Sequence, residues 1–336
     1  MPELVTLDDI RAAAARLSGV ALRTPLLPLP GASPPLLLKP ELLQPTGSFK
    51  IRGAYNAICS LPEEIRRRGV VAHSSGNHAA AVAWAAGLLG VPAAVVIPSN
   101  APPGKIAAAR ASQAEVVICE PGLSARLAAT GELIRKHGYT LVPPFDDPAV
   151  IAGQGTIGLE IGTDCPQAGL VLVPISGGGL ISGIAAAVRA LCPDAVVIGV
   201  EPEHAADARD SLHQRQRVAW PVEETGRTLA DALRVEQIGE LPLAHMLAHV
   251  QDIITVTDGE LRAAIRWLAT RARLVAEPGG AAAVAAALFH AAELPAADVR
   301  VAVVSGGNIE PSLLAEVLIE APDESGPAAP AVARSA

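Results

Sequence analysis

Short apolar runs alternate with alanine-rich stretches along most of the 336-residue chain. An apolar run without polar alternation is typical of a strand buried on both faces, as in parallel sheets covered by helices. The predicted strands are residues 70–72, 93–97, 115–118, 170–174, 196–200 and 301–304. The predicted helices include residues 78–89, 105–112, 180–190, 258–272 and 280–291. This alternation predicts an α/β fold in which helices flank mostly parallel sheets.

The composition excludes several classes of protein. Half of the residues are hydrophobic, so the chain can bury a large aliphatic core and most of it is expected to be ordered. Its length suits one large domain or two interlocked domains. The net charge is −8, with only three Trp, three Phe and two Tyr. Nucleic-acid binding needs a basic patch and often stacking aromatics, so no nucleic-acid partner is expected.

The cysteines and the N-terminus indicate the cellular compartment in which the protein is expected. The four cysteines form no C-x-x-C pair, which predicts neither a disulfide framework nor a zinc site and favours a reducing, cytoplasmic setting. The acidic N-terminus does not resemble a secretory signal. Residues 79–97 are uncharged, but Gly87, Gly90 and Pro92 interrupt them. A helix, a turn and a strand are therefore predicted there, and no membrane segment.

Three of the predicted strands end in a turn of small residues. The turns are Ser-Ser-Gly-Asn at 74–77, Ser-Gly-Gly-Gly at 176–179 and Ser-Gly-Gly-Asn at 305–308. Ligands of open parallel sheets bind outside the carboxyl ends of the strands. One such turn is ordinary, whereas three of them predict a pocket in which the backbone closely approaches a ligand.

The central turn, at 176–179, precedes an alanine-rich helix. Glycines let the backbone wrap around an anion, and the N–H groups of a helix N-terminus attract negative charge, so a phosphate is the expected ligand. A tight turn without a ligand is the simpler interpretation. The spacing Gly177-x-Gly179-x-x-Ser182, with Glu201 after the next strand, is also close to a dinucleotide-binding fingerprint. A nicotinamide- or flavin-dependent enzyme is thus an alternative.

Lys50 lies between two glycine-containing turns, in Pro-Thr-Gly-Ser-Phe-Lys-Ile-Arg-Gly-Ala at 45–54. A lysine on its own is usually a solvated charge. Here its neighbours are small and apolar, which favours partial burial, and desolvation lowers the pKa of an amine so that it can act as a nucleophile or base. A buried amine and a single phosphate-binding turn are what a pyridoxal phosphate (PLP) enzyme needs.

Several motifs, in family order, resemble those of the fold-type II PLP enzymes, in the branch of threonine/serine dehydratases and serine racemase. They span roughly residues 5–320 and lie at 48–54, 74–78, 143–156, 176–179, 277–278 and 305–308. The resemblance implies a tryptophan synthase β-like fold with two open, twisted, mostly parallel sheets. It also implies a homodimer with PLP as cofactor and a small amino acid as substrate.

The resemblance also implies roles for single residues. Lys50 is similar to the lysine that binds PLP covalently and acts as base at the substrate Cα, and Ser75 to the second acid/base of a racemase. The implied cofactor-binding residues are Phe49, Lys50, Asn77, Ser176, Gly177, Gly178, Gly179, Leu180 and Ser305. The implied substrate-carboxylate loop is Ser74, Ser75, Gly76, Asn77 and His78.

Within the cofactor set, the resemblance places the amides of 176–180 at the phosphate, Asn77 at the ring hydroxyl and Ser305 at the pyridine nitrogen. A hydroxyl does not hold that nitrogen protonated as a carboxylate would, which suits β-elimination more than transamination. The expected activity is therefore a dehydratase that converts L-threonine, L-serine or a related β-hydroxy amino acid to a 2-oxo acid and ammonia. The alternatives are serine racemase and a dehydratase of hydroxyaspartate or of a hydroxyectoine-pathway intermediate.

A second site is suggested by Glu201 and Asp207, which resemble the divalent-cation ligands of the family, with the carbonyl of Ala205 as a third ligand. Oxygen ligands suit Mg²⁺ or Ca²⁺. A solvated acidic loop is an equal alternative, because carboxylates are common in loops.

The chain departs from the family pattern at two positions. Ala232 stands where a glycine is usual, and Pro144 where a histidine is common. Both are expected to border the substrate pocket, so they leave the substrate open. His73 and His78 flank the asparagine turn, but the resemblance gives neither an acid/base role, and they are expected to be loop or core histidines.

The implied domain organisation is discontinuous. Residues 1–71 and 142–320 are expected to form a large PLP-binding domain, and 72–141 a small domain that carries the substrate loop and closes over the site. Residues 321–336 are expected to be a disordered tail. No regulatory domain is expected after the catalytic region, which favours a catabolic role.

Overall fold

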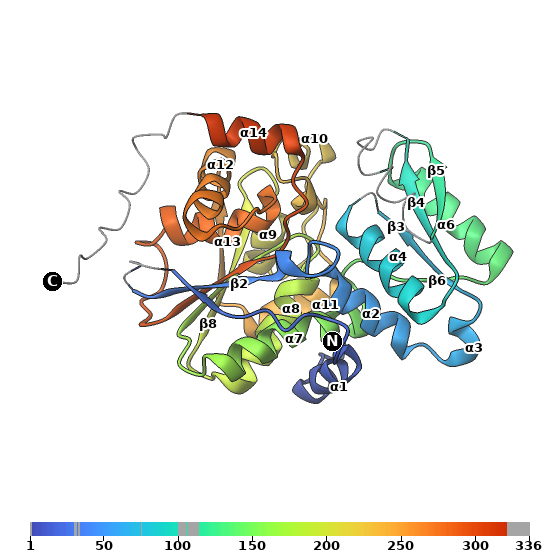
Figure 1. Cartoon of the computed structure of the whole chain (residues 1–336), viewed down its shortest axis with the longest axis horizontal. Coiled ribbons are helices and arrows are strands. Elements are labelled where there is room, and N and C mark those ends of the chain that lie inside the picture. Colours follow the sequence, from blue (N-terminus) through green and yellow to red (C-terminus); the bar gives the residue numbers. More distant parts are fainter. Residues whose placement is uncertain are drawn as a thin grey trace.

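Two sheets and their surrounding helices form the protein, which a computed structural model describes at residues 2–29, 32, 34–74, 76–99, 106 and 114–320 (Figure 1). The larger sheet has the strand order β1-β2-β10-β7-β8-β9, and the smaller one β5-β4-β3-β6. Within the described strands, β1 pairs antiparallel with β2 and all other pairs are parallel. The predicted α/β fold with two mostly parallel sheets is confirmed.

The strands follow the predicted positions closely. Their bounds are β1 (Leu27–Pro28), β2 (Leu36–Pro40), β3 (Val70–His73), β4 (Ala93–Pro98), β5 (Glu115–Cys119), β6 (Thr140–Leu141), β7 (Leu170–Pro174), β8 (Val196–Pro202), β9 (Asp252–Val256) and β10 (Arg300–Val304). All six predicted strands are present, and β1, β2, β6 and β9 are additional.

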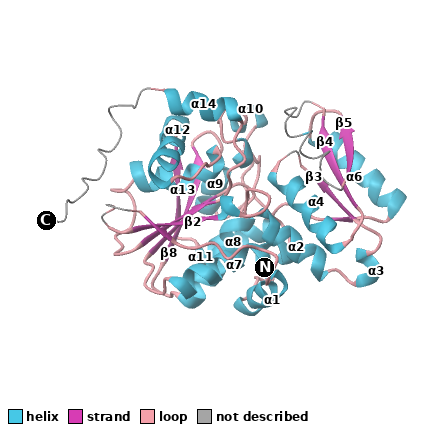
Figure 2. Ribbon diagram, viewed as in Figure 1, coloured by secondary structure: helices cyan, strands magenta, loops and turns pink. Residues whose placement is uncertain are grey.

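Helices cover both sheets (Figure 2). They are α1 (Leu7–Leu17), α2 (Lys50–Ser60), α3 (Glu63–Arg66), α4 (Asn77–Leu89), α6 (Leu123–His137), α7 (Pro148–Asp164), α8 (Gly179–Leu191), α9 (Asp207–Gln214), α10 (Val222–Thr225), α11 (Glu240–His249), α12 (Asp258–Trp267), α13 (Pro278–Phe289) and α14 (Pro311–Ile319), with short turns η1 (Glu41–Leu43), η2 (Asp231–Leu233) and η3 (Leu268–Ala272). None of these described helices is long and apolar enough to cross a bilayer.

Two helix predictions need comment. Residues 258–272 were expected to form one helix, but α12 ends at Trp267 and continues as the π-helical turn η3, which stops where Arg273 takes a left-handed backbone with φ 61°. The predicted helix at 105–112 lies outside the described residues except for Ile106, and so does the predicted tail at 321–336.

The larger sheet is buried on both faces. Alternate residues such as Leu172 and Val304 pack with α12 and α13, whereas their neighbours Val173 and Val303 pack with α7, α8 and α11. The smaller sheet packs one face on α2 and α4 and the other on α6. Burial on both faces explains why the central strands are continuous apolar runs in the sequence.

Helix α7 contains four glycines and yet forms a regular helix. A Cβ at Gly153 would lie 2.5 Å from the carbonyl oxygen of Arg52 in α2, and one at Gly158 would lie 2.6 Å from that of Ile184 in α8. Each glycine lowers helix propensity by roughly 0.5–1 kcal/mol relative to alanine. The close packing that they permit offsets this cost and brings α2 and α8 against one helix.

Strands β7 and β10 lie side by side at the point where the strand order reverses. The chain leaves β7 toward β8 on one side, whereas β10 pairs with β7 on the other side. Ligands of open α/β sheets bind at such a switch point, beyond the carboxyl ends of the strands. The predicted turns at 176–179 and 305–308 follow these two strands, so the topology places them together.

Candidate active site

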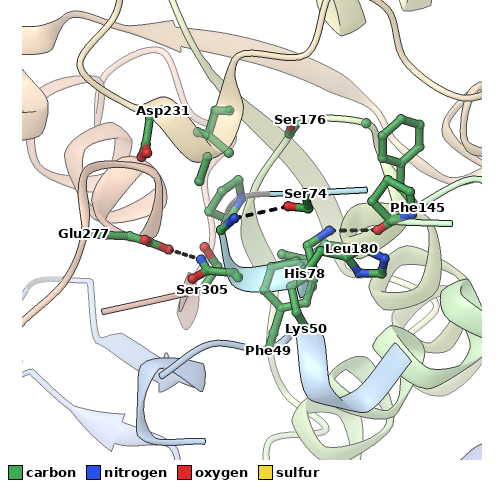
Figure 3. Close-up of a pocket in the computed structure, with 18 of the residues that line it drawn as sticks. Phe49, Lys50, Ser74, His78, Phe145, Ser176, Leu180, Asp231, Glu277 and Ser305 are labelled. Carbon is green, nitrogen blue, oxygen red and sulfur yellow. Dashed lines mark hydrogen bonds between the residues drawn. The ribbon is translucent and has the colours of Figure 1, made fainter. Parts of the chain in front are cut away.

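A pocket of about 260 Å³ lies among the turns that follow β3, β7 and β10 (Figure 3). It is lined by every implied cofactor or substrate residue that the structure describes: Phe49, Lys50, Ser74, Gly76, Asn77, His78, Ser176, Gly177, Gly178, Gly179, Leu180 and Ser305. Pro144 and Ala232, which depart from the family pattern, line it as well. Ser75 lies outside the described residues.

Lys50 is the first residue of α2, and its amine lies in the pocket. Its Nζ donates a hydrogen bond to the carbonyl oxygen of Pro144 at 2.7 Å and lies 5.1 Å from the ring centre of Phe49 (Figure 3). Desolvation by burial lowers the pKa of this amine to about 8. A useful fraction of Lys50 is therefore neutral near neutral pH, as a nucleophile or base requires.

The segment before Lys50 is fixed to the end of β10. The N–H of Phe49 donates to the carbonyl oxygen of Ser305 at 3.1 Å, and Ser48 forms a bridge with Gly306. Ser305 is buried and lines the pocket. These contacts bring the Lys50 amine and the Ser305 hydroxyl into one site although they are far apart in the sequence.

Gly177 and Gly178 form a turn that a residue with a Cβ would distort. A Cβ at Gly177 would lie 2.1 Å from the Phe145 ring, and Gly178 has a left-handed φ of 89° with Pro242 directly beside it. The turn leads into α8, whose first residue is Gly179. Free N–H groups at a helix N-terminus, reached through glycines, suit a phosphate.

Asn77 is held in place from two sides. Its Nδ2 donates to Oε1 of Glu277 at 2.6 Å, and its Oδ1 accepts from Nδ2 of Asn308 at 2.7 Å. One N–H of the Asn77 amide is then left to donate to a ligand oxygen. This geometry suits the implied role beside a ring hydroxyl.

His78 is a buried histidine, as expected. Its Nε2–H donates to the carbonyl oxygen of Val142 at 2.8 Å, which assigns the tautomer. Burial and the nearby charge of Lys50 lower the pKa of His78 to about 3. The imidazole is therefore neutral and adds no positive charge beside Lys50.

Four charged side chains are buried together beneath the start of α2. Arg52 donates to Glu41 through two bonds of 2.8 Å and to Glu160 through bonds of 2.6 and 3.1 Å, while Lys39 donates to Glu160 at 2.5 Å. Burial raises the pKa of Glu41, but the charge and hydrogen bonds of Arg52 outweigh burial and leave it lowered. This charge cluster joins β2, η1, α2 and α7, and anchors α2 two residues beyond Lys50.

Glu201 and Asp207 lie at the end of β8 and the start of α9, outside the pocket lining. Glu201 is fully buried and accepts from the backbone N–H groups of Ala208 and Arg209 at 3.1 and 2.9 Å. A carboxylate in this position does not suit contact with a ribose, which disfavours the dinucleotide interpretation. Burial and the charge of Asp207 raise the pKa of Glu201.

The Asp207 carboxylate is buried, and neither oxygen makes a hydrogen bond of good geometry. Burial raises the pKa of Asp207 to about 7. Within the described part of the chain, no group of three or more His, Cys, Asp or Glu side chains is arranged around a metal position. A cation here would have two carboxylates and the Ala205 carbonyl as its protein ligands.

Arg126 and Asp231 also line the pocket, and sequence reasoning missed both. The Nε of Arg126 is buried without a hydrogen bond, and no carboxylate among the described residues pairs with its guanidinium. Burial and the Arg126 charge lower the pKa of His73. Arg126 lies in the first turn of α6, where no local motif marks it as a pocket residue.

Fold and site together define an α/β protein in which a glycine turn suited to a phosphate lies at a switch point, in one pocket with the buried amine of Lys50. The family model described as "Pyridoxal-phosphate dependent enzyme" matches residues 17–306. The chain belongs to this family.

Known relatives have related activities. The chain is 41% identical over 332 residues to an L-threonine ammonia-lyase of Thermotoga maritima, covering 96% of this chain and 80% of the relative. It is 38% identical over 311 residues to an L-threo-3-hydroxyaspartate ammonia-lyase of Saccharomyces cerevisiae, covering 91% and 94%. Maize serine racemase superposes with a TM-score of 0.88 at 34% identity, covering 94% of this chain and 97% of that chain. The fold-type II architecture is confirmed.

Proposed function

We propose that this protein is a PLP-dependent ammonia-lyase that converts L-threonine, L-serine or a related β-hydroxy amino acid to a 2-oxo acid and ammonia. The observation that carries the proposal is the Lys50 amine, with a pKa of about 8, in one pocket with the glycine turn. The activities named for the relatives support it. PLP, when bound, supplies an electron-withdrawing ring that acidifies the Cα–H of the substrate.

The residues of the pocket fit this cofactor. Residues 176–180 offer backbone N–H groups to the phosphate, and the absence of a Cβ at Gly177 leaves room for the Phe145 ring against the turn. Asn77 offers an N–H to the ring hydroxyl, and Ser305 a neutral hydroxyl to the ring nitrogen. The proposed substrate-carboxylate loop consists of Ser74, Ser75, Gly76, Asn77 and His78.

Lys50 has two tasks in this proposal. With PLP bound, its neutral Nζ would hold the cofactor aldehyde, and once released by the substrate amine the same Nζ would accept the Cα proton. The β-hydroxyl would take up one proton and leave as water, which balances the Cα proton that Lys50 accepts. The released product would then take up water to give the 2-oxo acid and ammonia. The neutral Ser305 supports elimination over transamination, because a hydroxyl does not keep the ring nitrogen protonated.

Alanine at position 177 is expected to weaken PLP binding roughly tenfold to a hundredfold, because its Cβ would collide with the Phe145 ring and overpacking costs about 1–3 kcal/mol. PLP titration of the apoenzyme measures the effect. Gly259→Ala is the control, since its Cβ would meet only Thr257 Oγ1 at 3.8 Å. The double variant with Phe145→Ala should recover binding, and undiminished affinity of Gly177→Ala would contradict the proposed cradle.

The rate at which the apoenzyme recombines with PLP is expected to rise with pH and to level off above about 8. Only the neutral amine attacks the aldehyde, and burial lowers the pKa of Lys50 from its usual 10.5 to about 8. Stopped-flow absorption at saturating PLP gives this profile. A midpoint near the usual lysine value would contradict a buried amine.

A substrate panel tests the proposed reaction. L-threonine, L-serine and L-threo-3-hydroxyaspartate are incubated with the holoenzyme, and 2-oxo acid, ammonia and amino-acid enantiomers are quantified. A 2-oxo acid and ammonia in equal amounts support elimination. An inverted amino acid as the main product supports the racemase alternative, in which Ser75 is the second acid/base. No product from any member of the panel would overturn the proposal.

One observation favours hydroxyaspartate as a second candidate substrate. Arg126 contributes an unpaired guanidinium to the pocket, while the glycine turn and the loop at 74–78 offer the groups for the phosphate and the α-carboxylate. A second substrate carboxylate would pair with this cation, and a hydrogen bond to a charged group contributes about 1.5–3 kcal/mol. A kcat/KM for hydroxyaspartate above that for threonine would support this candidate.

We also propose that Glu201, Ala205 and Asp207 bind a divalent cation, Mg²⁺ or Ca²⁺. The buried Asp207 carboxylate without a well-formed hydrogen bond supports this, because a cation would satisfy its oxygens. Either ion should raise the Tm of the protein and leave the Tm of Asp207→Asn unchanged. An equal response of both proteins would contradict the site.

The quaternary structure, compartment and domain roles complete the proposal. We propose a homodimer in the cytoplasm, and four free cysteines agree with a reducing compartment. Residues 1–71 and 142–320 would bind PLP, and 72–141 would close over the substrate. Light scattering tests the dimer, and a change in small-angle scattering on addition of substrate tests the closure.

A further inference from the structure

Two adjacent residues, Phe145 and Asp146, contact two neighbouring parts of the site. Phe145 packs against the glycine turn, and Asp146 binds the start of α11. The Phe145 ring fills the space beside Gly177, and its backbone lies beside Gly179. The Asp146 carboxylate lies at the start of α11, where its Oδ2 and Oδ1 accept from the N–H groups of Glu240 and Leu241, each at 3.0 Å. One short segment thus touches the turn directly and also holds the start of a helix.

The start of α11 depends on Asp146 for its capping. Its N-cap residue is Gly239, which has no side chain to accept a hydrogen bond from the first turn. The first N–H groups of a helix need such a partner, and a carboxylate there is also favoured by the helix dipole. Asp146 supplies this carboxylate from a segment 94 residues earlier in the chain.

The same start of α11 is the outer wall of the glycine turn. The N–H of Gly239 donates to the carbonyl oxygen of Gly177 at 3.2 Å. Pro242 lies against Gly178, because a Cβ built at Gly178 would be 2.7 Å from the Cβ of Pro242. A shift of α11 therefore changes the backbone of both residues that shape the turn.

We propose that Asp146 is a positioning residue for the phosphate-binding turn, acting through Gly239 and Pro242 without touching the ligand. The proposal rests on the proposed binding of the PLP phosphate at this turn. Loss of a capping side chain costs roughly 1 kcal/mol, so phosphate-dependent affinity should fall about fivefold to tenfold.

The neighbouring Asp147 provides a matched control. It is the N-cap of α7, and its Oδ1 accepts from the N–H of Val150 at 2.9 Å. Asp146→Ala and Asp147→Ala each remove a capping carboxylate from adjacent positions, but of the two capped helices it is α11 that contacts Gly177, through the N–H of Gly239, and Gly178, through Pro242. Asp146→Asn keeps an acceptor oxygen for one of the two N–H groups and serves as the conservative variant.

The experiment compares PLP with pyridoxal, which has the same ring and aldehyde but no phosphate. Affinities of the apoenzyme for both are measured by absorption titration, with Tm as a separate readout. Asp146→Ala should lose about fivefold to tenfold in affinity for PLP and keep its affinity for pyridoxal. Asp146→Asn should show a smaller loss, and Asp147→Ala should lower Tm without changing the preference for PLP.

A second variant, at Gly239, disturbs the same contact between Asp146 and α11. A Cβ at Gly239 would lie 2.7 Å from Cγ of Asp146 and from Cδ of Pro242, so Gly239→Ala should show the same selective loss. Equal weakening of PLP and pyridoxal in Asp146→Ala or Gly239→Ala, or no weakening of either, would overturn the positioning role. A wild-type protein without preference for PLP would instead refute the proposed phosphate site.

Discussion

Replacement of Lys50 by alanine should lower the turnover of β-hydroxy amino acids by at least about 10⁴-fold, because one amine both binds the cofactor and moves the Cα proton. Phosphate binding at the glycine turn does not need the amine, so the variant should still bind PLP, but without a covalent bond. The 2-oxo acid assay measures turnover. Loss of the visible absorption band, and of borohydride-dependent labelling at position 50, reports the covalent bond.

Lys136→Ala is the matched control for this variant. Lys136 is exposed in the last turn of α6, so its replacement should leave turnover and cofactor absorption unchanged. Borohydride labelling of another lysine in Lys50→Ala, with turnover retained, would mean that a different amine serves the site.

Replacement of Arg52 by methionine should lower the free energy of unfolding by about 3–5 kcal/mol, the cost of removing one partner from a buried ion pair. Glu41 and Glu160 would then share Lys39 as their remaining cationic partner in the charge cluster. Native proteins are stable by only about 5–15 kcal/mol, so this is a large fraction of the total. Urea denaturation followed by fluorescence measures the change.

The loss should depend on pH with a defined sign. In the wild type, Arg52 holds the pKa of Glu41 below its unfolded value, so this stabilisation is present above the unfolded pKa and is lost as pH falls through the folded one. In Arg52→Met, burial raises the pKa of Glu41, so the folded state gains a proton and the deficit shrinks at acidic pH. The difference in stability should therefore be larger at neutral than at mildly acidic pH.

Arg67→Ala provides the comparison for an exposed ion pair. Arg67 pairs with Glu63 one helical turn earlier, and both side chains are well exposed to solvent. Exposed pairs contribute about 0–1 kcal/mol, so this variant should be close to the wild type. A similar loss in both arginine variants would show that burial of the cluster is not the source of its energy.

Strands could be predicted where their burial leaves a continuous apolar run in the sequence. They were missed where the residues that make the burial possible lie far away in the chain. The core strands β7 and β8 read as continuous apolar runs, and both were expected. β2 was missed because Lys39 and Pro40 interrupt its apolar run. The charge of Lys39 is compensated by Glu160, 121 residues later, and no local pattern shows this pairing. Helix α7 was missed because its glycines lower helix propensity, and their benefit lies in contacts with α2 and α8.

The same distinction applies to the site. Residues in contiguous motifs, such as Lys50 and the glycine turn, were found from the sequence because the chemistry and the turn are local. Arg126 reaches the pocket through the folding of α6, where the surrounding sequence carries no motif. Asp231 stands directly before Ala232, which was expected to border the pocket, but its own place in the lining was not predicted. Asp146 lies inside a motif, but its role is visible only through its contact with α11, which begins 94 residues later in the chain.

The place of β10 in the larger sheet has a consequence for how the protein is made. This strand lies between β2 and β7, with Ala302 opposite both Leu38 and Leu172. A nascent chain therefore carries β2 and β7 with unpaired edges until β10 leaves the ribosome. Such long-range pairing slows folding and exposes edges that aggregate, so newly made chains should depend on chaperones until β10 has been made.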